Sequence, residues 1–242
     1  MSIEYQPLTR EGLGVQIADA IREAIVEGRL MVDERLPGET ELAERFGVSR
    51  ATVREALKRL AAQNLIRTRR GPAGGAFVNR LSRDEAQETI VTVSRLMIGM
   101  NEIDFESAAE ARFALEAACL PLAAKRREDE HLAAMRVEVA AQRDPEIDDE
   151  AFCASDVRFH CAVAEAAGNP MLAMQICGAV EAMQPLMNML TYRLRDRKAV
   201  AALHEGMADA LEARDAAAAR ARLDELAAYA ATLAAARRAR AG

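Results

Sequence analysis

The sequence predicts a mainly α-helical protein with a small β-hairpin near its N-terminus. Hydrophobic residues make up 51% of the chain and aromatic residues only 4%, and tryptophan is absent. The chain is rich in alanine, leucine, glutamate and arginine, which favour helices. Apolar residues recur at three- and four-residue steps through most of the sequence, and strand-like runs are confined to one short region. With 242 residues, the chain has room for two domains.

Two helices are predicted near the start of the chain. Apolar residues recur at four-residue steps from Leu13 to Ile25. This spacing predicts an amphipathic helix, which Gly28 can end in a left-handed conformation. A second, short helix is expected over residues 41–46, because Gly47 stops it.

A third helix and a hairpin complete the first domain. Ser49 is the predicted N-cap of a helix that runs from Arg50 to about Gln63. Two strand-like runs, 65–69 and 76–78, flank a segment rich in glycine and proline and predict a hairpin. Together these elements predict a winged helix–turn–helix. The expected boundaries are residues 1–80 for the domain, about 38–62 for the helix–turn–helix and about 65–78 for the wing. The expected small core consists of Leu42, Phe46, Val48, Val53, Leu57 and Leu60.

The rest of the chain, residues 84–240, is predicted to contain only helices. Six short breaks interrupt the helical periodicity, which gives about seven helices and an antiparallel α-helical bundle. The breaks fall near Asn101–Asp104, Arg127–Glu130, Asp144–Asp149, Gly168–Pro170, Arg193–Lys198 and Ala213–Asp215.

Charge is distributed unevenly between the two parts. The formal net charge is −6, which excludes a wholly basic, histone-like protein. Residues 45–70 nevertheless hold eight lysines and arginines against one acidic residue, Glu55. Such a run is often only a solvated helix surface. In an acidic protein it favours a polyanionic partner, because phosphate contacts dominate the affinity of proteins for nucleic acids.

Hydropathy and cysteine spacing indicate where in the cell the protein is expected and the state of its cysteines. No apolar run approaches the length of a membrane helix, and residues 1–10 lack the pattern of a signal peptide. We therefore expect a cytoplasmic protein. The four cysteines show no Cys-x-x-Cys spacing, so we expect small buried hydrophobic residues rather than disulfides or a zinc ribbon. They are Cys119, Cys153, Cys161 and Cys177.

The first domain is predicted to bind double-stranded DNA. In a helix–turn–helix, the N-terminal residues of the recognition helix reach base edges in the major groove. Arg50, Thr52 and Arg54 stand there, and an arginine can pair bidentately with guanine. Arg70 and Gly71 of the wing can contact phosphates or the minor groove. The alternative is a winged helix that binds another protein, with arginines that only increase solubility.

The run from Leu36 to Leu57, LPGETELAERFGVSRATVREAL, resembles the signature of the GntR family of bacterial transcription regulators. The resemblance implies a homodimer that binds a near-palindromic operator. At Thr40, where FadR-type members often carry arginine, we expect a weaker contact or none. The DNA contacts that the resemblance implies are Ser49, Arg50, Thr52, Arg54, Arg70 and Gly71.

The second part resembles the FCD domain of the FadR subfamily. The residues that carry this resemblance are Arg112–Glu116, Asp156–His160, Gly168–Pro170, His204 and Ala213–Asp215. The resemblance implies a domain that binds a small-molecule effector and forms dimers.

A metal site is expected in this domain. Asp156 and His160 are four residues apart, so they project from one face of a helix and can bind the same cation. With His204 they occupy three positions of the Asp-His-His-His site that the resemblance implies. The fourth position falls on Leu226, which cannot ligate, with Tyr229 about one turn later. We expect a divalent metal, zinc above others, on three side chains. The alternative is that these side chains form hydrogen bonds in a polar ligand cavity.

Arg112 is the expected anchor of a carboxylate effector. It should face inward if the apolar residues that follow it mark the buried stripe, and a buried guanidinium requires a partner. That partner is either the ligand carboxylate or Glu116, four residues along the same helix. Asn188 and Tyr192 share a helical face and are expected to line the same cavity, although neighbouring methionines also fit an ordinary core.

The sequence therefore predicts a ligand-responsive regulator, most simply a repressor that leaves its operator when a small carboxylate binds. An acyl thioester or the metal alone is the alternative signal. A metal-dependent enzyme is disfavoured, because no general base or nucleophile motif accompanies the three metal-binding residues. No catalytic residue is assigned.

Overall fold

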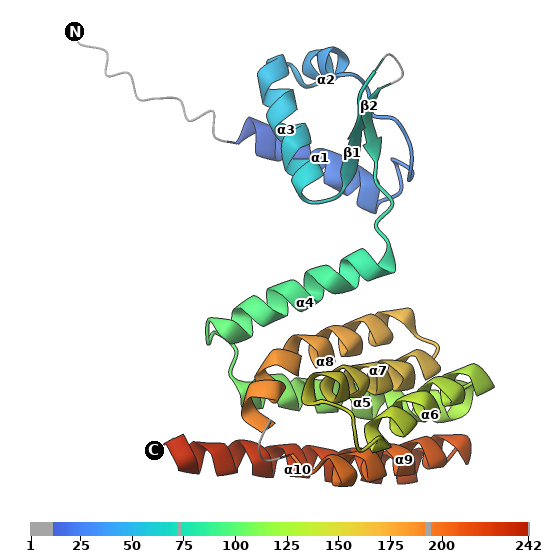
Figure 1. The fold of residues 1–242 in the computed structure, drawn as a ribbon. Coiled ribbons are helices and arrows are strands. Elements are labelled where there is room, and N and C mark those ends of the chain that lie inside the picture. The colour runs from blue at the N-terminus through green and yellow to red at the C-terminus, as the bar shows by residue number, and fades with distance from the viewer. Residues whose placement is uncertain (1–11, 72–73, 192–194, 242) are drawn as a thin grey trace. The chain divides into compact units, whose positions relative to one another are not determined.

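The computed structural model describes residues 12–71, 74–191 and 195–241. Contacts within the chain divide it into two compact units, Met1–Ser82 and Arg83–Gly242. The described residues form ten helices and one two-stranded antiparallel sheet (Figure 1). The predicted mainly α-helical fold is confirmed.

The first unit contains three helices and the hairpin. Ile66 pairs with Val78 and Arg69 with Gly75, so the register of the two strands is antiparallel. This is the predicted order of helix, helix, turn, helix and wing. The elements are α1 (Leu13–Val26), α2 (Glu39–Phe46), α3 (Arg50–Ala62), β1 (Ile66–Arg69) and β2 (Gly75–Val78).

The core of the first unit lies between α1, α3 and the hairpin. Val53 and Leu60 of α3 are fully buried, together with Val78 of β2. Gly47 has a φ of 64°, which lets the chain leave α2 in the left-handed conformation that glycine adopts without strain. Phe46, expected in the core, is 41% exposed. It is the last residue of α2 and lies beyond the buried residues of that helix.

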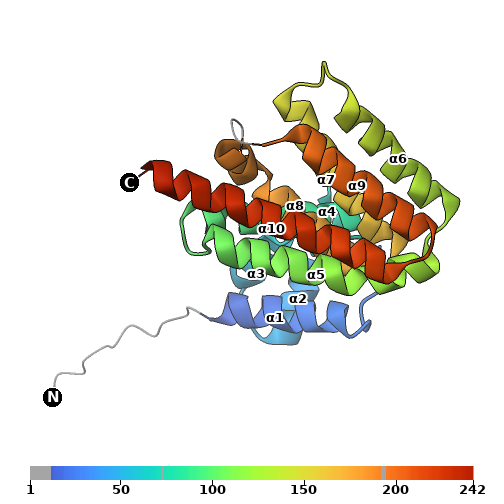
Figure 2. The ribbon, with the colours of Figure 1, turned by 90° about the horizontal axis from the view of Figure 1, so that it is seen from below.

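The second unit is a bundle of seven helices. Their ends coincide closely with the breaks predicted from the sequence. Figure 2 shows α10 between α5 and α9. The helices are α4 (Arg83–Gly99), α5 (Phe105–Arg126), α6 (Asp129–Arg143), α7 (Asp149–Ala166), α8 (Pro170–Thr191), α9 (Arg197–Glu212) and α10 (Ala216–Ala241). Among the described residues, no helix is both long and apolar enough to cross a membrane.

Six helices, α5 to α10, contribute buried residues to one large core. Leu120 of α5, Met135 of α6, Phe159 of α7, Ile176 of α8 and Leu211 of α9 are all fully buried. These helices are thereby fixed against one another, and they hold the polar side chains of the site described below.

The expectation about cysteines is wrong for one pair. Cys161 of α7 and Cys177 of α8 are joined by a disulfide, with their Cα atoms 5.1 Å apart. The pair is brought together by the packing of α7 on α8, which cysteine spacing in the sequence does not show. Cys119 and Cys153 are free and buried, as expected.

Candidate functional site

The N-terminal half of α3 presents the predicted DNA-binding side chains. Arg50 and Arg54 are one turn apart and exposed. The guanidinium of Arg54 donates to both carboxylate oxygens of Glu39, at 3.2 and 2.8 Å. The Ser49 hydroxyl accepts from the backbone N–H of Thr52 at 3.1 Å and lies 2.8 Å from the Thr52 hydroxyl. Ser49 therefore caps the helix and fixes the start of this surface.

The wing carries further basic side chains. The guanidinium groups of Arg67 and Arg69 lie 5.9 and 5.3 Å from the centre of the Phe77 ring. Arg70 and Gly71 are exposed at the end of β1. Within the described residues, Arg50, Arg69 and Arg70 have no carboxylate partner within 4.0 Å, so their charges are available to an anionic ligand. Residues 72 and 73 lie outside the described residues.

A cluster of buried polar side chains lies within the second unit. It combines Glu116 of α5, Asp156 and His160 of α7, and His204 of α9. Both histidines are fully buried. Oδ1 of Asp156 lies 4.0 Å from Nε2 of His160 and 3.7 Å from Nε2 of His204. The structure thus brings together the three side chains that the sequence singled out as metal ligands.

The orientation of His160 is set by Glu116. Nδ1 of the ring lies 2.8 Å from Oε2 of Glu116. Because an ionised carboxylate only accepts hydrogen bonds, Nδ1 carries the proton and Nε2 carries the lone pair. Within the described residues, Nδ1 and Oε2 lie at ion-pair distance but are not aligned as a hydrogen bond, and Nε2 has no hydrogen-bond partner.

A chain of polar contacts sets the orientation of His204 in the same way. The Ser155 hydroxyl donates to the backbone carbonyl of Glu138 at 3.2 Å and accepts from Nε2 of Gln142 at 3.2 Å. Oε1 of Gln142 therefore faces Nδ1 of His204, 2.7 Å away, and accepts a hydrogen bond from its N–H. Nε2 of His204 is again left with a lone pair and has no partner among the described residues.

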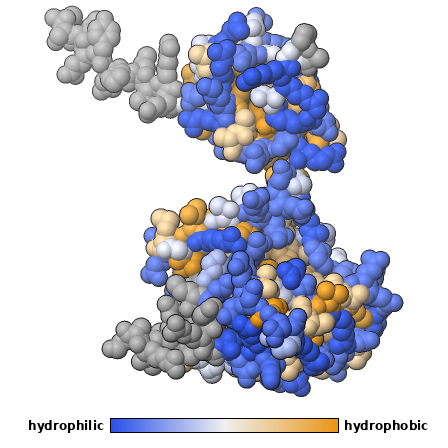
Figure 3. Space-filling model, in the orientation of Figure 1, coloured by the Kyte–Doolittle hydropathy of each residue, from blue (hydrophilic) through white to orange (hydrophobic). Residues whose placement is uncertain are grey.

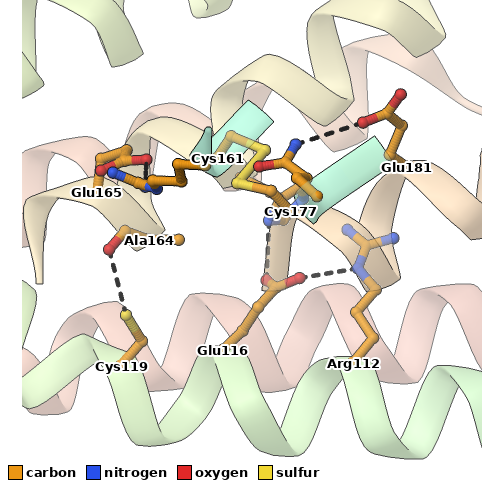
Figure 4. Close-up of a disulfide and its surroundings, with 11 residues drawn as sticks. Arg112, Glu116, Cys119, Cys161, Ala164, Glu165, Cys177 and Glu181 are labelled. Carbon is orange, nitrogen blue, oxygen red and sulfur yellow. Dashed lines mark hydrogen bonds and ion pairs between the residues drawn. A yellow bond between two sulfur atoms is a disulfide. The ribbon is translucent and has the colours of Figure 1, made fainter. Parts of the chain in front are cut away.

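Arg112 lies beside the cluster and is 4% exposed. Its Nε donates to Oε1 of Glu116 at 2.8 Å, and its Nη2 lies 3.9 Å from Oδ2 of Asp156 (Figure 4 shows the pair with Glu116). Of the two partners that the sequence left open for Arg112, the internal one, Glu116, is present.

The protonation states of the cluster suit a cation. Burial alone raises the pKa of Asp156, but His160, His204 and Arg112 outweigh it and lower the pKa to about 2. Burial and the neighbouring His160 lower the pKa of His204 to about 3. At neutral pH, Asp156 is thus an anion and His204 a neutral ring, the forms in which these side chains bind metals.

The residues present fit a three-ligand metal site. Asp156, His160 and His204 each offer a ligand atom, and these atoms lie within 4.8 Å of one another. Two of them are buried imidazole nitrogens that have no other partner. Leu226 lines a cavity of about 20 Å³ together with Asp156 and is itself buried. Tyr229 also lines this cavity, and its hydroxyl accepts from the backbone N–H of Asp196 at 2.6 Å.

A larger cavity shares one lining residue with this small one. It has a volume of about 400 Å³, and Arg195 lines both cavities. The side-chain oxygen of Asn188 is buried and lacks a hydrogen-bond partner among the described residues. Nη1 of Arg195 donates to Sγ of Cys153 at 3.0 Å, and no carboxylate of the described residues lies within 4.0 Å of it. Tyr192, the other predicted effector contact, lies outside the described residues.

Comparison with known families identifies both units. Residues 13–78 match the family model of bacterial regulatory proteins of the gntR family, and residues 107–229 match that of the FCD domain, which covers half of the chain. The chain belongs to the GntR family. It combines the unit that defines this family of bacterial regulatory proteins with an FCD domain.

Several curated regulators are similar to this GntR-family protein. A putative L-lactate dehydrogenase operon regulatory protein of Escherichia coli is 34% identical over 175 residues, covering 71% of this chain and 65% of that protein. The repressor NanR of Cronobacter sakazakii is 30% identical over 177 residues, covering 70% of this chain and 64% of that protein. The chain thus spans slightly less than two thirds of the length of these relatives.

A solved structure shows the same fold. The Streptococcus agalactiae protein GntR has a TM-score of 0.51 and 22% identity, and the match covers 93% of this chain and 99% of that one.

Three residues near the buried polar cluster of this regulator were not predicted from the sequence. Gln142 and Ser155 lie in α6 and α7, and no motif connects them to His204 on α9. Arg195 stands in a break between helices, where an arginine looks like an ordinary exposed residue. One sequence signal pointed to Gln142: it follows the apolar Val139 by three residues and therefore lies on the buried face of α6.

Proposed function

We propose that this GntR-family protein is a homodimeric, cytoplasmic repressor that leaves its operator when a small carboxylate binds to the second unit near a zinc ion. The observation that carries the proposal is the pair of buried Nε2 lone pairs, on His160 and His204, that face Asp156 and have no other partner. Such atoms are costly to bury unless a ligand satisfies them. A bound zinc ion would supply a Lewis-acidic position for a carboxylate oxygen.

The DNA contacts that we propose lie on α3 and the wing. Arg50 and Arg54 would read bases in the major groove, and the hydroxyls of Ser49 and Thr52 would contact bases or phosphates. Arg70 and Gly71 would meet the backbone or the minor groove. Glu39 holds one edge of the Arg54 guanidinium, which leaves the other edge for a base.

Dimer formation is supported by an exposed apolar stripe that runs along α4 to Met100, the residue after its end. Its members are Val93, Leu96, Met97 and Met100, between 37% and 68% exposed. They recur at steps of three and four, the spacing of a helix–helix seam. Figure 3 shows this apolar surface near the C-terminal end of α4. The proposed occupant is the same stripe of a second copy, because a near-palindromic operator requires two-fold symmetry and α4 continues directly from the DNA-binding unit.

The effector that we propose is a small hydroxy acid. Arg195 offers a guanidinium that lacks a carboxylate partner, which suits a ligand carboxylate. The buried oxygen of Asn188 requires a hydrogen-bond donor, such as a ligand hydroxyl. The 20 Å³ cavity beside Asp156 holds little more than one water molecule, so the ligand would occupy the larger cavity. The name of the Escherichia coli relative, which refers to an L-lactate dehydrogenase operon, is consistent with this class.

A thermal-shift experiment tests the effector proposal. Metal-stripped and zinc-loaded protein are each titrated with 2-hydroxy acids, sugar acids and acyl thioesters, because a ligand that binds only the native state raises the melting temperature. We expect a hydroxy acid to raise the melting temperature most in the zinc-loaded protein and far less in Arg195→Gln. Arg143→Gln, a paired surface arginine of α6, is the matched control. A shift caused only by acyl thioesters, or by zinc alone, would refute the carboxylate effector.

Selection from a random double-stranded DNA library tests the operator proposal. We expect enrichment of a near-palindromic sequence. Addition of the stabilising acid should weaken binding to the enriched duplex. Absence of any enriched sequence would contradict the DNA-binding role.

A further inference from the structure

We propose that Cys161 and Cys177 are a reversible redox-modification site whose state controls how α4 docks on α7 and α8. The proposal rests on the proposed function in two steps, the cytoplasmic environment and the effect on DNA binding. Disulfides are rare in the cytoplasm, where those that form are usually transient or serve redox sensing. A disulfide between two helices of a cytoplasmic regulator is therefore more than a static link.

The position of the pair connects it to α4. Glu165 is one turn after Cys161 and pairs with Arg83, the first residue of α4. Glu181 is one turn after Cys177 and accepts from Gln87 of α4 at 3.5 Å. Residues four apart share a helix face, so Cys177 lies on the face of α8 along which α4 packs, and Cys161 lies on the face of α7 that carries the Arg83–Glu165 pair. Figure 4 shows Cys161 and Cys177 between Glu165 and Glu181.

The contact of α4 at this point is tight. A Cβ atom at Gly178, the residue after Cys177, would lie only 2.8 Å from Cγ2 of Ile90. Two unbonded thiols need more room than a bonded pair of sulfurs. Reduction would therefore move α7 and α8 apart directly beneath Ile90 and loosen α4. Because α4 begins at Arg83, immediately after the DNA-binding unit ends at Ser82, its docking is positioned to affect that unit.

The disulfide is also connected to the buried polar cluster. Cys161 directly follows His160, whose ring contacts Glu116. The disulfide therefore fixes the segment of α7 that carries both Asp156 and His160. The same covalent bond lies between the α4 contact and the proposed ligand site.

The chemistry that we propose is thiol–disulfide exchange with a low-molecular-weight disulfide, RSSR. Cys161 is partly exposed and Cys177 is 3% exposed, so the Cys161 thiolate attacks first. The S–S bond of RSSR breaks, one RS⁻ leaves and is protonated, and a mixed disulfide forms. The Cys177 thiolate then attacks Sγ of Cys161 and displaces the second RS⁻. Two electrons pass from the cysteines to RSSR, which yields the protein disulfide and two RSH.

The first experiment measures this exchange in the full-length protein. Mixtures of oxidised and reduced glutathione are applied, free thiols are trapped with a maleimide, and the protein is analysed by intact and peptide mass. We expect oxidation to remove two thiols together, at Cys161 and Cys177, and excess reduced glutathione to restore them. Cys119 and Cys153 should stay free. Failure of the pair to oxidise, or to be reduced again, would overturn the proposal.

The second experiment measures the coupling. Hydrogen exchange of residues 83–99 should be at least threefold faster in the reduced protein than in the oxidised one. The Kd for the selected duplex should differ by at least threefold between the two states. Both differences should vanish in Cys161→Ser and persist in Cys153→Ser. If the melting temperature of Cys161→Ser falls strongly, Cys177→Ala is used in its place. A disulfide that forms with unchanged exchange in α4 refutes the coupling. If no duplex is selected, the DNA-binding role fails, but the thiol and exchange measurements still decide the modification and its effect on α4.

Discussion

Nδ1 of His204 lies 2.7 Å from Oε1 of Gln142, and this contact decides which nitrogen of the ring faces Asp156. Gln142 is itself oriented by Ser155, whose hydroxyl donates to the backbone of Glu138. Through Ser155 and Gln142, the backbone carbonyl of Glu138 on α6 thereby determines which ring nitrogen of His204 on α9 carries the lone pair.

Replacing Gln142 by leucine should therefore weaken zinc binding by about 10–100-fold, the usual cost of losing an outer-shell partner of a metal-binding histidine. A competition titration against a chromogenic chelator measures this affinity. Gln63→Leu, in the other unit, should leave it unchanged. Equal zinc affinities of wild type and Gln142→Leu would show that this orientation is irrelevant to metal binding.

Replacing Leu226 by histidine should tighten zinc binding by about tenfold or more, because it adds a fourth ligand beside the three present. Leu233→His is the matched control. Leu233 lines the same cavity but is two helical turns further along α10. The same chelator competition provides the comparison. If both substitutions act alike, or neither does, Leu226 does not occupy a coordination position.

Replacing Arg50 or Arg54 by alanine should raise the Kd for the selected duplex by about tenfold or more, the loss expected for a bidentate base contact. Fluorescence anisotropy at fixed salt concentration measures this change. Arg59→Ala serves as the control, since Arg59 lies in the last turn of α3 and pairs with Glu55. Unchanged Kd values in both variants would remove α3 from the DNA interface.

Acid should destabilise the metal-free protein from about pH 6.5 downward. The pKa of His204 is about 3 in the folded state against an ordinary 6.5, so between these values the unfolded chain binds a proton that the folded chain does not. The free energy of unfolding then falls by up to about 1.4 kcal/mol per pH unit. Asp156 and Glu116, with pKa values lowered to about 2, extend the loss below about pH 4.5.

Urea unfolding at several pH values, with a chelator present, measures this slope. His204→Gln should flatten it between pH 6.5 and 5, whereas His131→Gln should not. A slope that survives in His204→Gln would have another origin.

Local patterns in the sequence predicted the fold well, because each element carries its own signals. Ser49, Gly28 and Gly47 mark helix ends by their intrinsic conformational preferences, and the breaks between helices are polar. Phe46 was misjudged because periodicity cannot tell whether the last residue of a helix reaches the core.

The candidate site was only half predictable. The four-residue spacing of Asp156 and His160 is a local signal, and a family resemblance added His204. The partners of the two imidazoles could not be found in this way, because Gln142 and His204 are 62 residues apart and meet only through packing. The same reason hid the pairing of Cys161 with Cys177.

The pair formed by Glu39 and Arg54 has a consequence for how operator preference changes among related regulators. Glu39 accepts from Nε and Nη2 of the guanidinium, so in the proposed complex Arg54 would already be held in place and would lose little side-chain entropy on binding DNA. Glu39 itself is not proposed to contact a base. A substitution at position 39 would nevertheless free the Arg54 side chain and so alter the recognised sequence. With the proposed contact of Arg54 to DNA, operator preference would depend on positions 39 and 54 together, and the two are expected to change together as such a regulator acquires new targets.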